Sequence, residues 1–146
     1  MPSSTRLLIA SDHAGFDFKE KIKKAFPQID WVDVGPHDTA RVDYPDYADR
    51  VAQKVVANGE RGVLICGSGQ GMAMRANRYS GVRAALAWNE DSIRLAREHN
   101  DANILCFGAR LVPLEMAKKL VEIFLSTKFE GGRHADRVEK LDKPCC

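Results

Sequence analysis

The chain has 146 residues, 45% hydrophobic and 29% charged, a composition typical of one globular domain and unlike that of a disordered chain. Its net charge of +2 argues against a protein that mainly coats nucleic acid or an anionic membrane. The apolar runs are far shorter than the roughly 20 residues of a membrane-spanning helix, and the first residues lack the apolar segment of a secretory signal. Four cysteines without C-x-x-C spacing favour a reducing, cytoplasmic location.

Short apolar runs alternate with segments of helical periodicity along the chain. Strands are predicted at residues 7–10, 29–34, 63–66, 82–87 and 104–107. Helices are predicted at 15–26, at 47–58, directly after the glycines of 67–71, from Asn89 to about His99, and from Pro113 onward. Residues 37–45 are predicted to form a loop, and the tail 128–146 shows no strong periodicity.

This alternation predicts an α/β fold in a single domain spanning residues 1–146. The expected architecture is a Rossmann-like, three-layer α/β/α arrangement around a five-stranded parallel sheet. In such folds the ligand binds outside the carboxyl ends of the strands. Because Asp12, His13, Cys66 and Arg110 each lie at or just after a predicted strand end, we expect them to gather at one rim.

The most informative segment is Cys66-Gly67-Ser68-Gly69-Gln70-Gly71-Met72. Its glycines allow successive backbone N–H groups to face one concavity, which suits an anion. Met72 occupies the position where a dinucleotide-binding G-x-G-x-x-G motif has its last glycine, and no Walker Gly-Lys pair is present. The segment therefore predicts an anion cradle that does not bind a nucleotide in the usual way.

Several candidate residues allow both a chemical and a structural interpretation. Cys66, near a predicted helix start, is either a reactive thiol or a small buried strand residue. Ser68 is either an oxyanion donor or a turn residue, and Asp12 either a site residue or a helix cap. His99 is either functional or a helix-dipole partner.

The arginines of the tail, the other cysteines and the histidines also allow predictions. Arg133 and Arg137, four residues apart, either bind one anion or form a solvated basic edge. Cys106 is expected in the core, and Cys145 and Cys146 in an exposed tail. The four histidines lack the spacing of a helical metal site, so no metal and no cofactor are expected.

Together these residues resemble the type B ribose-5-phosphate isomerases of the ribose/galactose isomerase family. The resemblance covers nearly the whole chain and is carried by six segments in the family's order: residues 11–15, 43–48, 66–72, 98–101, 107–110 and 129–134. It implies interconversion of ribose 5-phosphate and ribulose 5-phosphate through an enediolate, without a metal. Ser68 stands where many members have Thr, a departure that keeps the hydroxyl.

The resemblance also implies residue roles. Cys66 matches the family's base, and His99 matches the acid that opens the furanose ring. A branch of the family instead uses a glutamate where this chain has Met72, which strengthens the match of Cys66. The oxyanion cradle is formed by Ser68 and the backbone of Gly67, Gly69, Gln70 and Gly71. Asp12, Tyr44 and Asn100 surround the sugar, and His13, Arg110, Arg133 and Arg137 bind the phosphate. Part of the phosphate site comes from a second subunit, so a homodimer or larger homo-oligomer is implied, with the tail from about residue 128 at the interface.

Three other functions stay open at this point. The first is isomerisation of a six-carbon substrate, galactose 6-phosphate or allose 6-phosphate. The second is a non-catalytic sugar-phosphate- or nucleotide-binding module, which would bind without turnover. The third is a cysteine-based redox sensor, against which the absence of a resolving C-x-x-C partner argues.

Overall fold

One parallel sheet organises the chain, whose residues 5–145 are described by a computed structural model. It contains β1 (Arg6–Ser11), β2 (Asp30–Asp33), β3 (Gly62–Cys66), β4 (Ala84–Leu86) and β5 (Ile104–Gly108). The strand order is β2-β1-β3-β5-β4, and all four pairings are parallel. The chain thus adds β2 on one side of β1 and then crosses to place β3 on the other side.

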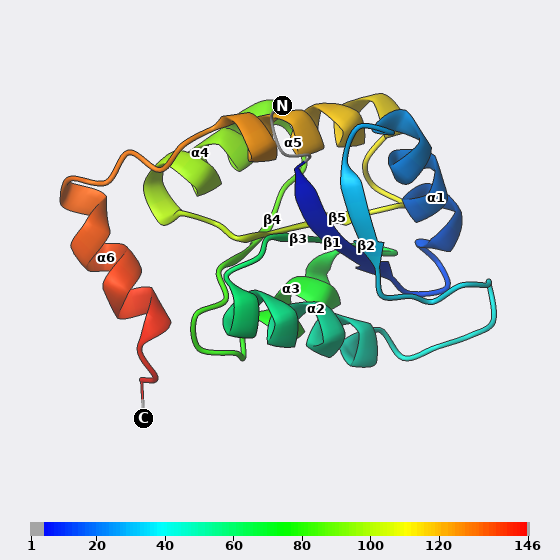
Figure 1. Cartoon of the computed structure of the whole chain (residues 1–146), viewed down its shortest axis with the longest axis horizontal. Helices are drawn as coiled ribbons and strands as arrows, with labels where there is room; N and C mark the ends of the chain where they lie inside the picture. Colours follow the sequence, from blue (N-terminus) through cyan, green and yellow to red (C-terminus); the bar gives the residue numbers. More distant parts are fainter. Residues whose placement is uncertain (1–4, 146) are drawn as a thin grey trace.

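Helices cover both faces of this sheet, as Figure 1 shows. They are α1 (Phe16–Ala25), α2 (Tyr44–Asn58), α3 (Gln70–Ala76), α4 (Glu90–Asn100), α5 (Leu114–Ser126) and α6 (Arg133–Asp142). Helices α1, α4 and α5 lie on one face and α2 and α3 on the other, whereas α6 stands beside the layers. The predicted single-domain, three-layer α/β fold is confirmed.

The strands are buried on both faces because each face packs against helices. Along β1, Leu7 and Ile9 join the core beneath α1 and α5, whereas Leu8 and Ala10 join the core beneath α2 and α3. All four side chains are fully buried. This two-sided burial explains why the strands appear in the sequence as continuous apolar runs rather than as alternating patterns.

Three elements differ from their predicted bounds or nature. Helix α2 begins at Tyr44 instead of residue 47, because Pro45 fits the first helical turn, where its missing N–H needs no partner. Strand β4 is shorter than predicted, at Ala84–Leu86. The tail, for which no periodic element was predicted, contains the ten-residue helix α6, whose buried side chains are only His134 and Val138.

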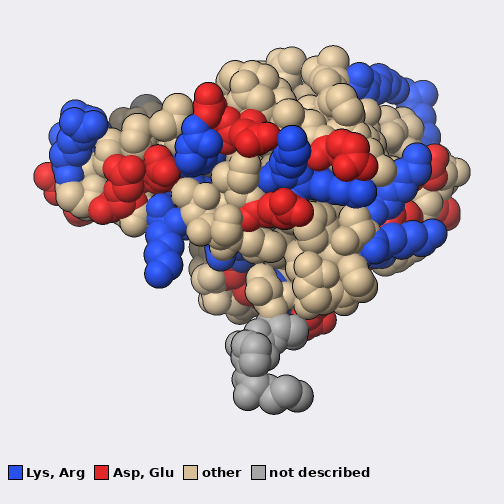
Figure 2. Space-filling view, turned by 90° about the horizontal axis from the view of Figure 1, so that it is seen from above, with Lys and Arg blue, Asp and Glu red and all other residues tan. Residues whose placement is uncertain are grey.

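Charged side chains are mixed on the face viewed in Figure 2, where Lys and Arg alternate with Asp and Glu over the surface. This distribution agrees with the small net charge and shows no single-sign patch on that face. Within residues 5–145, none of the helices has both the length and the apolar character needed to cross a membrane.

Candidate active site

A cavity of about 410 Å³ opens at the carboxyl ends of the paired strands β1 and β3, where the order in which strands are added to the sheet changes direction. Such a switch in strand order is where open α/β sheets bind their ligands. The cavity is lined by Asp12, His13, Ala14, Tyr44, Cys66, Gly67, Ser68, Gly71, Arg110 and Leu111. The structure therefore brings eight of the sequence-predicted site residues together within one chain.

Cys66 ends β3 with its thiol against the glycine loop. The side chain is 4% exposed, and Sγ accepts a hydrogen bond from the backbone N–H of Gly69 over 3.1 Å. Gly69 has φ +80°, and a Cβ there would lie 2.7 Å from the carbonyl carbon of Phe107. Only glycine fits this position, because its φ is left-handed and the Cβ of any other residue would clash with Phe107. In this conformation the N–H of Gly69 points at the sulfur.

The loops after β3 and β5 are locked together around the thiol. The N–H of Ala109 donates to the Cys66 carbonyl over 2.8 Å, and the N–H of Arg110 donates to the Gly67 carbonyl over 3.0 Å. Arg110 is exposed, its guanidinium lies over Gly67, and it forms no ion pair with any described residue. An arginine fixed in this way at a cavity mouth can bind an anion.

Asp12 and His13 occupy the opposite wall, directly after β1. The Asp12 carboxylate accepts the N–H of Gly15 over 2.9 Å, so this side chain both lines the cavity and fixes the turn into α1. His13 Nδ1 accepts the N–H of Val42 over 3.2 Å. A neutral imidazole with an acceptor at Nδ1 carries its proton on Nε2, which leaves a donor for a ligand.

Tyr44, the first residue of α2, closes one side of the cavity against the glycine loop. A Cβ on Gly71 would lie 2.4 Å from Cζ of the tyrosine, so the ring rests on the bare backbone. Gln70 is exposed and lines a neighbouring apolar hollow of about 220 Å³ instead. Met72 is fully buried among the core residues beneath α2 and α3 and does not line the cavity.

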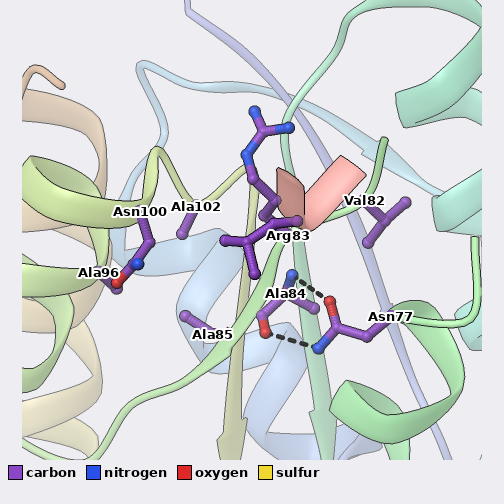
Figure 3. A pocket seen from close by; sticks show the side chains of 9 residues that line it. Asn77, Val82, Arg83, Ala84, Ala85, Ala96, Asn100 and Ala102 are labelled. Carbon is purple, nitrogen blue, oxygen red and sulfur yellow. Dashed lines mark hydrogen bonds between the residues drawn. The ribbon is translucent and has the colours of Figure 1, made fainter. Parts of the chain in front are cut away.

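The remaining predicted residues, His99, Asn100, Arg133 and Arg137, do not line this cavity. Cys66 lies opposite Gly108 at the carboxyl edge of the sheet, whereas the last turn of α4, with His99, leads into β5 at its amino edge. Asn100 lines a separate cavity of about 440 Å³, shown in Figure 3, to which β4, α4, Asn77 at the end of α3 and Leu141 of α6 contribute. Within one chain, His99 and Cys66 therefore lie at opposite edges of the sheet.

The edge of that second cavity is formed by β4, which pairs only with β5. The Asn77 amide donates to the Ala84 carbonyl and accepts the Ala84 N–H, over 2.9 and 2.8 Å, and both bonds are visible in Figure 3. The Asn77 side chain therefore covers part of the open edge of β4, and the N–H and C=O of Ala84 are hydrogen-bonded there.

Near the amino edge, His99 contacts a residue that the sequence predictions left out of the site. Its ring stacks on that of His134, with centroids 4.2 Å apart and planes 14° from parallel. Glu130 lies beside them, so the two histidines and this glutamate form a group of three potential metal ligands, the only one among residues 5–145. Two stacked rings direct their nitrogen lone pairs in separate planes, an arrangement that suits a ring contact better than one shared ion. The segment 129–134 was part of the family resemblance, which was the available signal for His134.

Cys106 and Cys145 do not line the cavity. Cys106 is fully buried in β5, as predicted, and burial together with the neighbouring Cys66 raises its thiol pKa. Cys145 is exposed, which agrees with the predicted tail, and Cys146 lies outside the described residues.

Comparisons with known proteins agree with this architecture. A family model described as Ribose/Galactose Isomerase matches residues 7–141. Ribose-5-phosphate isomerase B of Escherichia coli is 41% identical over 140 residues, which is 93% of each chain.

Solved structures of two proteins are also similar to this chain in fold and sequence. The ribose 5-phosphate isomerase of Thermotoga maritima superposes with a TM-score of 0.92 at 48% identity, covering 96% of this chain and 99% of that one. Ribose-5-phosphate isomerase B of Mycoplasma genitalium, solved with bound ribulose-5-phosphate, gives 0.90 at 43% identity, covering 97% and 96%. The chain belongs to the ribose/galactose isomerase family.

Proposed function

We propose that this protein is an aldose–ketose isomerase that interconverts ribose 5-phosphate and ribulose 5-phosphate. The observation that carries the proposal is the thiol of Cys66, set in a cavity beside Ser68 and hydrogen-bonded by the Gly69 N–H. The relatives named for this reaction support the substrate, and one of them was solved with ribulose-5-phosphate bound.

The proposed reaction moves the proton of carbon 2 to carbon 1 and, in balance, one hydroxyl proton from oxygen 2 to oxygen 1. Cys66 removes the proton from carbon 2 of the opened aldose and returns it to carbon 1, while the negative charge of the enediolate resides on oxygen. Ser68 and the loop N–H groups of residues 67–71 stabilise that oxygen, an interaction that is stronger in a partly enclosed site than in water. Met72 supports the assignment of the base, because its buried apolar side chain supplies no carboxylate.

The phosphate is assigned to the part of the cavity that His13 and Arg110 line. His13 offers its Nε2–H there, and Arg110 offers a guanidinium without an ionic partner among the described residues. Asp12 and Tyr44 line the same cavity and bind the sugar hydroxyls. This assignment gives the substrate one orientation, with its first two carbons at Cys66.

The remaining residues are assigned to a second copy of the chain. His99 and Asn100 lie at the amino edge of the sheet, and Arg133 and Arg137 are exposed on α6, so none of them lines its own chain's cavity. In a homodimer, His99 of one copy would open the ring of the sugar bound at Cys66 of the other. The two arginines would reach the phosphate, with the tail from about residue 128 at the interface.

The direct test is a coupled assay on the purified protein, with ribose 5-phosphate, allose 6-phosphate and galactose 6-phosphate at equal concentrations. We expect turnover of the five-carbon substrate to exceed that of both six-carbon substrates. A preference for a six-carbon substrate would move the protein to another member activity of the family. Binding of ribose 5-phosphate without turnover would contradict the enzyme proposal. A thiol base needs a reducing compartment, so we also infer a cytoplasmic location.

A further inference from the structure

The stacked pair of His99 and His134 joins two helix ends. His99 lies in the last turn of α4 and His134 in the first turn of α6, where its side chain is only 8% exposed. The ring centroids are 4.2 Å apart, with planes 14° from parallel. The buried imidazole of His134 therefore stacks on His99, the residue proposed to open the furanose ring.

The stack is one of few contacts that attach α6 to the rest of the fold. Beside it, the Glu130 N–H donates to the Glu98 carbonyl over 3.0 Å. At the far end of the helix, Arg83 binds the Asp142 carboxylate over 2.8 Å. Figure 1 shows that α6 otherwise stands apart from the layers. The start of α6 is thus fixed in position at the ring of His99.

The surroundings of His134 favour its uncharged form. Burial lowers its pKa most, and the neighbouring His99, Arg133 and Arg137 lower it further, whereas Glu130, 3.7 Å from Nε2, raises it. The N-terminal end of α6 also disfavours a positive charge. An uncharged His134 can lie against His99 without repelling it when His99 carries a proton.

We propose that His134 is a positioning residue for His99: its stacked ring fixes the plane of the acid and holds α6, with Arg133 and Arg137, at a set distance from it. This inference rests on the proposed function, in which His99 opens the furanose ring and the two arginines bind the phosphate. The acid and the phosphate-binding helix then reach the partner's cavity as one preassembled unit.

Two measurements separate this role from a general structural one. The first is turnover of ribose 5-phosphate, which is cyclic and requires ring opening. The second is exchange of the carbon-1 hydrogen of ribulose 5-phosphate with D₂O, followed by NMR at saturating substrate. This ketose is acyclic because its 5-hydroxyl is esterified, so exchange needs the base and the oxyanion cradle but no ring opening.

The variants are His134→Ala, which removes the stack, and His134→Phe, which keeps a ring without a titrating nitrogen. Val138→Ala is the control, because Val138 is the other buried residue of α6. We expect His134→Ala to lose about tenfold or more in aldose turnover with exchange nearly unchanged, since misplacing a catalytic group costs up to about 10²-fold. His134→Phe should recover most of that loss, and Val138→Ala should leave the ratio of the two rates as in wild type.

A ratio unchanged in His134→Ala, or a Phe variant no better than the Ala variant, would overturn the positioning role. Circular dichroism of each variant checks that it is folded, so that a loss of turnover is not caused by misfolding. A wild-type protein with neither turnover nor exchange would instead overturn the proposed function itself.

Discussion

The backbone N–H of Gly69 and the sulfur of Cys66 are hydrogen-bonded over 3.1 Å, with the sulfur as acceptor. The bond crosses the turn from β3 into α3, so the proposed base and the anion cradle form one rigid unit. Gly69 can supply it only because its backbone adopts φ +80°.

Replacement of this thiol gives the first prediction. Cys66→Ala should lower kcat for ribose 5-phosphate by about 10²- to 10⁴-fold, the usual contribution of a general base. Inorganic phosphate should still inhibit the residual activity, because His13 and Arg110 are unchanged. Cys106→Ala removes a buried thiol of the neighbouring strand and serves as the control, with activity close to wild type. Full activity in Cys66→Ala would rule out this cysteine as the base.

The conformation of Gly69 gives a second prediction, on stability. Gly69→Ala should cost about 3 kcal/mol of unfolding free energy, from about 1–2 kcal/mol of left-handed backbone strain plus the clash with Phe107. Gly59→Ala is a matched comparison, because Gly59 has φ +67° but no heavy atom within 4 Å of an added Cβ. It should cost only about 1 kcal/mol. Urea unfolding of both variants measures the difference, and equal losses would contradict the packing explanation.

The proposed sharing of the site between subunits gives a third prediction. Cys66→Ala and His99→Asn should each be nearly inactive alone. Co-refolded in equal amounts, they should recover about a quarter of wild-type activity, because about half of the dimers are mixed and each mixed dimer has one intact site. Activity that stays at the level of the single variants in a dimeric mixture would place both residues in the same chain's site.

The buried ammonium of Lys19 gives a fourth prediction. Its side chain is fully buried and donates to Asp33 over 2.8 Å and to the Pro36 carbonyl over 2.6 Å. Lys19→Met leaves both acceptors without this donor and should cost about 2–3 kcal/mol, somewhat below the usual loss for breaking a buried pair, because Lys23 still binds Asp33. Lys21→Met, on the exposed side of the same helix, should change stability by less than about 0.5 kcal/mol.

Acid should weaken the same cluster, which is the fifth prediction. Burial raises the pKa of Asp33, but hydrogen bonds from Lys19, Lys23 and the Gly35 N–H outweigh it, so the pKa is lowered overall. The folded protein then binds fewer protons than the unfolded chain, so this contribution is complete above the ordinary carboxyl pKa of about 4 and is lost as the pH falls through the lower, folded value. Unfolding free energies measured from pH 6 to pH 2.5 should fall less steeply in Asp33→Asn. An unchanged slope would contradict the assignment.

Much of the fold could be predicted from local patterns. A helix was predicted to begin at Asn89, and the Asn89 side chain does accept the Ser92 N–H over 2.8 Å in a complete capping box. The start of α2 was placed too late because Pro45 was assigned to a loop, although a proline also suits the first helical turn. Helix α6 was missed although Ala135, Val138 and Leu141 recur at three-residue spacing, because this apolar stripe is narrow and lies among many charged residues.

The candidate site, like the fold, could be predicted from the sequence only in part. The residues at strand ends could be grouped in advance, because parallel strands all end at one edge, and they do line one cavity. His99 could not be grouped with them by this rule, because it lies at a helix end and helices of this fold return to the opposite edge. Its contact with His134 joins segments 35 positions apart that no local periodicity relates.

The placement of Cys66 and His99 at opposite edges of the sheet has a kinetic consequence. From Gly62 to Cys66, β3 rises about 13 Å, and this rigid strand separates the two edges within each copy. If each copy completes the other's site, a single chain has no complete active site, so specific activity should depend on protein concentration. Dilution below the dissociation constant of the assembly would then act as an off-switch without any effector.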